Sequence, residues 1–150
     1  MKLTADMSFD ALLEMAVQDP SVVPEIERRF RSNVAILVVD FSSMRRRMDA
    51  FGTIPALLDI RVAMNTYLPV VDSFQGRVIK TVADTVFAVF ESPSNALEAA
   101  LDGHRQMALC NVSREGDIAR GIPNAPIYPK AGLGYGPSFI TPEGNLYGPE

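Results

Sequence analysis

A continuous run of β-branched and aliphatic residues, Val34 to Val39, ends directly on Asp40. The run has the length of a strand and no polar alternation, which is typical of a strand buried on both faces. A carboxylate at the end of such a strand is costly to bury unless a cation lies beside it. Asp40 is therefore the first residue for which we expect a functional role.

Two further patterns downstream of this strand predict a helix and a hairpin. Apolar residues recur every three or four positions from Leu57 to Val71, as they do in a long amphipathic helix. The β-rich runs Arg77 to Val82 and Thr85 to Phe90 flank Ala83-Asp84, which predicts a tight hairpin.

Ser92-Pro93 predicts the start of another helix, because serine caps helix N-termini and proline fits the first helical position. The stretch from Asn111 to Pro129 has no clear period and is expected to be a long loop. A glycine-rich, strand-like stretch, Ala131 to Gly136, follows it. The buried face of the helix is expected to hold Leu97, Ala100, Leu101, His104, Met107 and Ala108.

The order of these elements predicts an α+β fold of the ferredoxin-like type, β-α-β-β-α-β, with a mainly antiparallel sheet. In this arrangement the end of the first strand, with Asp40, lies beside the hairpin that carries Asp84. Residues 33–150 are expected to form one domain with its own core. Residues 1–32 are expected to be a helical extension that serves as a linker or as a dimerisation element, and the sequence favours neither.

Composition limits the partners that such a domain can have. The net charge is −4 and basic residues are scattered, so nucleic acid is not an expected partner. The one basic cluster, Arg45 to Arg47, is either a solvated helix face or a device that steers phosphates. A single cysteine, Cys110, excludes an internal disulfide, and no apolar stretch approaches the roughly 18 residues of a membrane span. We expect a cytoplasmic location and no membrane contact within this chain.

The two aspartates suggest chemistry on phosphates. Carboxylates that meet at one sheet edge repel each other unless a divalent cation lies between them, and Mg²⁺ uses one or two carboxylates together with phosphate oxygens. Asp40 and Asp84 therefore favour a two-metal phosphoryl site. The alternative is that Asp84 is a turn residue and Asp40 a helix N-cap.

Four segments of the chain resemble, in order, the catalytic domain of class III adenylate and guanylate cyclases. They are Val34 to Asp40, Gly76 to Phe90 with its Lys-Thr-x-x-Asp hairpin, Ala131 to Gly136, and Asn145 to Glu150. The resemblance covers roughly residues 33 to 150 and implies formation of 3′,5′-cyclic AMP and pyrophosphate from ATP, with GTP as the second possible substrate.

The resemblance also implies roles for individual residues. Asp40 and Asp84 fall on the two family positions whose aspartates hold two divalent cations, Mg²⁺ or Mn²⁺. The resemblance therefore implies that Asp40 and Asp84 are the catalytic residues. Backbone N–H groups of the following turn would bind phosphates at a helix start. The residues of that turn are Phe41, Ser42, Ser43 and Met44.

Two positions match the family's base-reading residues. Lys80 falls on a lysine that donates to the adenine ring in adenylate cyclases, where guanylate cyclases place glutamate, and this favours ATP. Asn145 falls on a partner position that is often aspartate, and an amide both accepts and donates, so discrimination against GTP is expected to be weaker. By the family pattern the sites lie between two subunits, which implies a homodimer.

Some features depart from the family pattern. Ser43 and Ala83 stand where the family usually has glycine, at positions that favour φ > 0. The family's ribose-positioning Asn and transition-state Arg fall beyond Glu150, so the 150-residue chain by itself is expected to be inactive. These departures, together with Asn145, support an alternative: a catalytically inactive cyclase-homology domain that binds nucleotide or regulates a partner.

Overall fold

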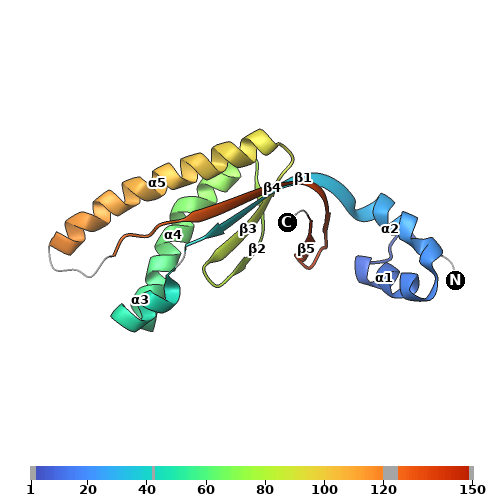
Figure 1. The fold of residues 1–150 in the computed structure, drawn as a ribbon, viewed down its shortest axis with the longest axis horizontal. Helices are drawn as coiled ribbons and strands as arrows, with labels where there is room; N and C mark the ends of the chain where they lie inside the picture. Colours follow the sequence, from blue (N-terminus) through green and yellow to red (C-terminus); the bar gives the residue numbers. More distant parts are fainter. Residues whose placement is uncertain (1–2, 42, 120–124, 149–150) are drawn as a thin grey trace. The chain divides into compact units, whose positions relative to one another are not determined.

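The computed structural model describes residues 3–41, 43–119 and 125–148 (Figure 1). The chain divides into two compact units. The larger unit is Val34–Tyr135, and the smaller one consists of Met1–Asn33 with Gly136–Glu150.

The larger unit has the expected ferredoxin-like order, with two helices in the first connection. Strands β3 and β1 are antiparallel neighbours, β2 pairs antiparallel with β3, and the sheet order is β2-β3-β1-β4. The α+β prediction is therefore confirmed, and the hairpin has the predicted bounds. The elements are β1 (Arg31–Asp40), α3 (Met44–Phe51), α4 (Thr53–Ser73), β2 (Arg77–Val82), β3 (Thr85–Phe90), α5 (Pro93–Ala119) and β4 (Lys130–Ile140).

Helices α4 and α5 cover one face of this sheet and form the core with it (Figure 1). Alternate residues of β1 and β3 point toward the helices, as the two-residue period of a strand requires. These buried strand residues are Ala35, Leu37, Val39, Val86, Ala88 and Phe90. The helices contribute Ala63, Tyr67, Val71, Ala96, Ala99 and Met107, among others.

Helix α4 differs from the sequence expectation in one respect. By length and composition alone, this helix is apolar enough to cross a membrane, whereas no such stretch was expected. The core helix of a globular domain passes the same test, and α4 buries Tyr67 and Val71 against the sheet and α5. One of its turns also carries the buried Asp59.

The predicted buried face of α5 is confirmed at Ala100 and Met107 and is wrong at the two leucines and at Ala108. Leu97 and Leu101 are 49% and 53% exposed, and smaller side chains are buried instead. The reason is close packing against α4, since a Cβ added at Gly103 would lie 2.3 Å from the Tyr67 ring. The residues that α5 buries are Ala96, Ala99, Ala100, Gly103, Met107, Asn111 and Arg114.

The predicted loop from Asn111 is also wrong in its first part, because α5 continues to Ala119. The apolar period breaks here because two polar residues, Asn111 and Arg114, are buried on the helix face that follows Met107. Of the remaining predicted loop, residues 120–124 lie outside the described residues and 125–129 form neither helix nor strand.

In the smaller unit, α1 (Phe9–Gln18), the short η1 (Pro20–Val22) and α2 (Val23–Phe30) lie with the end of β4 and with β5 (Leu146–Tyr147). Helix α1 begins after Ser8, whose side chain caps it by accepting from the Ala11 N–H at 3.2 Å. The Phe9 ring lies 5.3–6.0 Å from the rings of Phe30, Phe139 and Tyr147. This aromatic cluster joins the helices to the β4–β5 strands.

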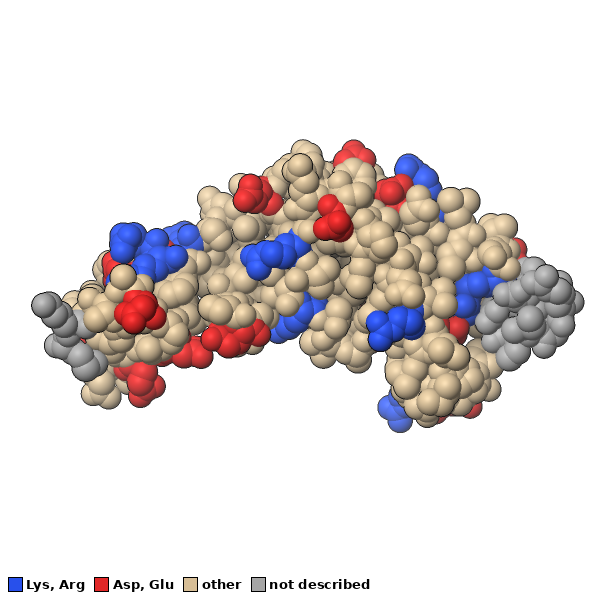
Figure 2. Space-filling view, turned by 180° about the vertical axis from the view of Figure 1, so that it is seen from behind, with Lys and Arg blue, Asp and Glu red and all other residues tan. Residues whose placement is uncertain are grey.

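The face of the molecule in Figure 2 carries basic and acidic side chains interspersed among uncharged ones.

Gly103→Ala should lower the free energy of unfolding by about 1–3 kcal/mol, because the added methyl group overlaps the Tyr67 ring in a packed core. Helix propensity alone predicts the opposite sign, a gain of about 1 kcal/mol. Urea denaturation of both proteins measures the difference. A stabilised variant would mean that α4 and α5 do not pack this closely at Gly103.

Candidate functional site

The fold brings the backbones of Asp40 and Asp84 together. Asp40 is the last residue of β1 and lies opposite Thr85 in the antiparallel register with β3. The next amide, of Phe41, donates to the Asp84 carbonyl oxygen at 3.1 Å. The two aspartates therefore sit at the same end of two hydrogen-bonded strands, as the predicted topology requires.

Both aspartates are half-buried, and no residue in the described ranges forms a salt bridge with either carboxylate. Within the same ranges no group of three or more His, Cys, Asp or Glu side chains gathers as a metal site. A pair of carboxylates without a cationic partner fits Mg²⁺ or Mn²⁺, since such ions complete their coordination with water and phosphate oxygens. It does not fit a closed structural zinc site, which needs four protein ligands.

Ser43 and Ala83, which stand where glycine was expected, adopt the backbone conformation that glycine favours. Ser43 has φ = 86° and Ala83 has φ = 53°, both in the left-handed region. An L-residue there costs roughly 1–2 kcal/mol. The chain therefore keeps the turn geometry on both sides of the aspartate pair at some cost in stability.

The turn after Asp40 uses its residues unequally. The Phe41 side chain is buried edge-on to the Tyr67 ring, 5.7 Å between centroids, and its N–H is bonded to Asp84. Ser42 lies outside the described residues. Ser43 precedes α3, and its hydroxyl accepts no hydrogen bond from the helix. The backbone N–H groups of Ser43 and Met44 donate to no other described residue. Within the described part of the predicted turn, these two N–H groups are thus the ones available to a phosphate.

Lys80 lies on β2 opposite Phe87 of β3. Its Nζ is 5.4 Å from the centroid of the Phe87 ring, within cation–π range. The Phe87 ring on the neighbouring strand thus stabilises the positive charge of Lys80. Both residues belong to the hairpin that also carries Asp84.

Asn145 belongs to the smaller unit and is exposed in the turn between β4 and β5. Its backbone carbonyl accepts from the Thr141 N–H at 2.9 Å, and its N–H donates to Thr141 Oγ1 at 3.2 Å. These bonds hold the turn through the backbone, so the amide side chain is available for a ligand.

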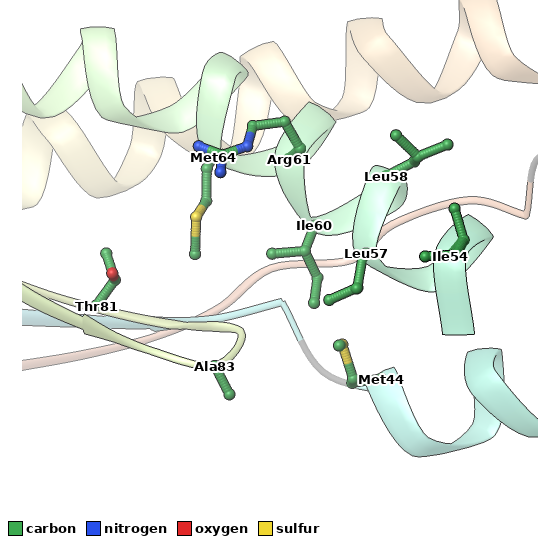
Figure 3. A pocket seen from close by; sticks show the side chains of 9 residues that line it. All are labelled: Met44, Ile54, Leu57, Leu58, Ile60, Arg61, Met64, Thr81 and Ala83. Carbon is green, nitrogen blue, oxygen red and sulfur yellow. The ribbon is translucent and has the colours of Figure 1, made fainter. Parts of the chain in front are cut away.

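A groove of about 540 Å³ opens beside the hairpin turn (Figure 3). Met44 of the predicted phosphate turn, Thr81 and Ala83 form one side, and the first half of α4 forms the other. In Figure 3, Leu57 and Ile60 point from α4 toward the side that holds Met44 and the hairpin. The groove is mostly apolar, and Ala83 in its wall directly precedes Asp84 in the chain. The α4 residues that line it are Ile54, Leu57, Leu58, Ile60, Arg61 and Met64.

A buried group of charges near this site was missed from the sequence. Asp59 of α4 accepts from Arg47 of α3 at 2.7 Å through one carboxylate oxygen and from Arg114 of α5 at 2.6 Å through the other. All three side chains are about nine-tenths buried. Neither proposed role of the Arg45–Arg47 cluster describes Arg47, which is an internal ion-pair partner.

The chain that leads into β4 is held by side chains of α3 and α5. Asn111 of α5 pairs with the Ile127 backbone through two hydrogen bonds of 2.8 Å, as a neighbouring strand would. Arg47 and Arg114 both donate to the Ala125 carbonyl, and Arg47 also donates to that of Pro126. The helical spacing of Asp59 with Ala56 and Ala63, and of Arg114 with Met107 and Asn111, was the signal that could have revealed this group.

Comparison with known proteins gives one kind of match. No protein-family model and no curated protein matches the sequence. Solved structures match in fold: a bacterial light-regulated adenylyl cyclase at 15% identity and TM-score 0.63, and an adenylate/guanylate cyclase/hydrolase from Silicibacter pomeroyi at 23% and 0.63. A class III adenylyl cyclase-like ATP-binding protein from Pseudomonas aeruginosa matches at 20% and 0.58.

Each match covers 79% of this chain, which corresponds to 62%, 64% and 28% of the respective neighbours. The chain therefore spans less than two thirds of each of these proteins. At these identities the likeness is one of fold, and the chain has the fold of class III cyclase catalytic domains.

Ala83→Gly should raise the free energy of unfolding by about 1 kcal/mol, because relief of left-handed strain outweighs the entropy that glycine loses on folding. Ala108→Gly, at an exposed position inside α5, is the control and should lower it by about 1 kcal/mol. Urea denaturation compares the two. A loss in both variants would show that Ala83 does not hold a left-handed conformation in solution.

Proposed function

We propose that this chain provides the metal-binding and nucleotide-binding residues of a nucleotide cyclase that converts ATP into 3′,5′-cyclic AMP and pyrophosphate. The observation that carries the proposal is the pair Asp40 and Asp84, placed at adjacent strand ends without a cationic partner in the described chain. The likeness of fold to adenylyl and guanylyl cyclases supports it.

Asp40 and Asp84 would hold two Mg²⁺ or Mn²⁺ ions. When bound, such ions lower the pKa of an attacking ribose 3′-hydroxyl and take up charge on departing phosphates. The chain itself would orient the triphosphate through backbone N–H groups of Ser43 and Met44, where the positive end of the α3 dipole favours an anion.

Lys80 and Asn145 would read the base. The ammonium group of Lys80 donates only, which suits the N1 acceptor of adenine, and the Asn145 oxygen accepts from the adenine amino group. ATP is therefore the proposed substrate, with GTP as a weaker one. We propose that the active form is a homodimer in which one subunit provides the aspartates and the other the base-reading residues, and that it acts in the cytoplasm, where ATP is abundant.

A second function has an observation in its favour. The strained Ser43 and Ala83 and the fold match to a cyclase-like ATP-binding protein fit a catalytically inactive domain that binds nucleotide and regulates a partner. This alternative predicts metal-dependent ATP binding without cyclic AMP formation. The same assays distinguish the two functions.

In the full-length natural protein, Asp40→Asn or Asp84→Asn should lower cyclic AMP formation from ATP by about 100-fold or more, since loss of a metal ligand removes several kcal/mol of transition-state stabilisation. The metal-free variants should be no less stable than the parent, because the substitution removes repulsion between carboxylates. Mn²⁺ should raise the melting temperature of the parent and not that of the variants.

Asp49→Asn is the matched control, because Asp49 is an exposed carboxylate on α3. It should leave both turnover and the Mn²⁺ effect unchanged. Parent-like turnover in Asp40→Asn would refute the metal assignment, and ATP binding without turnover in the parent would favour the inactive module.

Lys80→Glu should shift the preference from ATP toward GTP, because a carboxylate accepts from the guanine N1–H where lysine donates to the adenine N1. Loss of one buried base contact is worth about 1–3 kcal/mol, or roughly tenfold to 100-fold in the ratio of kcat/KM values. Lys130→Glu, a charge reversal at an exposed position of β4, is the control. An unchanged ratio in Lys80→Glu would remove Lys80 from the base pocket.

A further inference from the structure

Helix α3 is attached to the domain in an unusual way. It has eight residues, and Arg47 is its one buried residue. A helix this short is marginal on its own and depends on tertiary packing for its stability and position. Most buried helix faces are apolar, but here the attachment is a guanidinium group.

The contacts of Arg47 fix its position from several directions. Its Nη1 lies 2.7 Å from Asp59 Oδ2 on α4 and 3.2 Å from the Ala125 carbonyl, and its Nη2 donates to Pro126. Charge-assisted bonds of this kind are directional, because the planar guanidinium presents its N–H groups in a fixed fork. An apolar residue in the same place would fill the space without fixing the orientation of the helix.

Arg47 is also one turn away from the start of the helix. Its backbone N–H donates to the Ser43 carbonyl at 2.8 Å, which closes the first turn of α3 directly after the left-handed Ser43. The position of the Ser43 and Met44 amides is thus coupled to the position of the Arg47 guanidinium.

We propose that Arg47 is a positioning residue for phosphate binding: its buried pairing with Asp59 and two carbonyl groups sets the first turn of α3 and the amides that bind the triphosphate. This inference rests on the proposed cyclase function. It adds a role for a buried ion pair that touches neither the metal ions nor the nucleotide.

Arg114 provides a matched comparison. It pairs with the other oxygen of the same Asp59, donates to the same Ala125 carbonyl and is buried to the same degree, but it belongs to α5. Loss of either arginine leaves Asp59 with one partner. A purely structural role predicts similar effects for Arg47→Met and Arg114→Met, whereas positioning predicts an effect on phosphate binding for Arg47 alone.

The experiment compares Arg47→Met, Arg47→Lys, Arg114→Met and the exposed control Arg105→Met on α5 in the full-length natural protein. Two measurements are made on each: amide hydrogen exchange, and cyclic AMP formation as a function of Mn²⁺–ATP concentration. In Arg47→Met, exchange in Met44–Phe51 should be about tenfold faster than in Arg114→Met, since the helix opens locally once its attachment is lost.

The same variant should have a higher KM for Mn²⁺–ATP and a kcat/KM at least about tenfold below that of Arg114→Met, because small displacements of binding groups carry large penalties. Arg47→Lys, which keeps the charge opposite Asp59 but not the fork, should fall between the parent and Arg47→Met. Arg105→Met should match the parent in both measurements. If Arg47→Met does not fold, Arg47→Lys supplies the comparison with Arg114→Met.

Equal exchange in Met44–Phe51 for the Arg47 and Arg114 variants would overturn the inference, whatever the activity of the protein. Faster exchange with equal loss of kcat/KM in both would overturn it as well. A parent protein that makes no cyclic AMP would instead refute the proposed function, and hydrogen exchange would still decide whether Arg47 holds the helix.

Discussion

The pairing of β1 with β3 is the constraint on which the remaining architecture depends. It joins the apolar run Val34–Val39 to the hairpin, places the faces that receive α4 and α5 side by side, and ends where Asp40 lies opposite Thr85. The hydrogen bond from Phe41 to Asp84 extends the pairing by one step into the turn. Asp40 and Asp84 are thereby held at one sheet end by backbone geometry, and their placement depends on the same strands that form the core with the helices.

Much of this arrangement could be predicted from local patterns. The hairpin, the Ser8 cap and the strand that ends at Asp40 depend on residue type and period, which act over a few neighbouring residues. The left-handed turns at Ser43 and Ala83 could also be predicted, because the resemblance identified positions that glycine usually occupies. The roles of Asp40, Asp84, Lys80 and Asn145 remain proposals, since the fold positions these residues without testing what they bind.

The parts that could not be predicted depend on contacts between distant segments. The face of α5 was predicted from the helical spacing of apolar residues, but Tyr67 on α4 admits only small residues at Gly103 and leaves Leu97 and Leu101 outside. Arg47 and Arg114 look solvated when each is considered among its neighbours in sequence. Their burial follows from Asp59, which lies 12 and 55 positions away from them. A charged residue can be assigned to a core only when its partner is known.

The two hydrogen bonds between Asn111 and Ile127 make helix α5 part of the alignment of β4. An amide side chain on α5 pairs with the Ile127 backbone as a neighbouring strand would, so the register of the chain that enters β4 is set at Ile127. Arg114 holds the Ala125 carbonyl from one turn farther along the helix. A shift of α5 along its axis would therefore carry the chain that enters β4 with it, so that helix and strand move as one body.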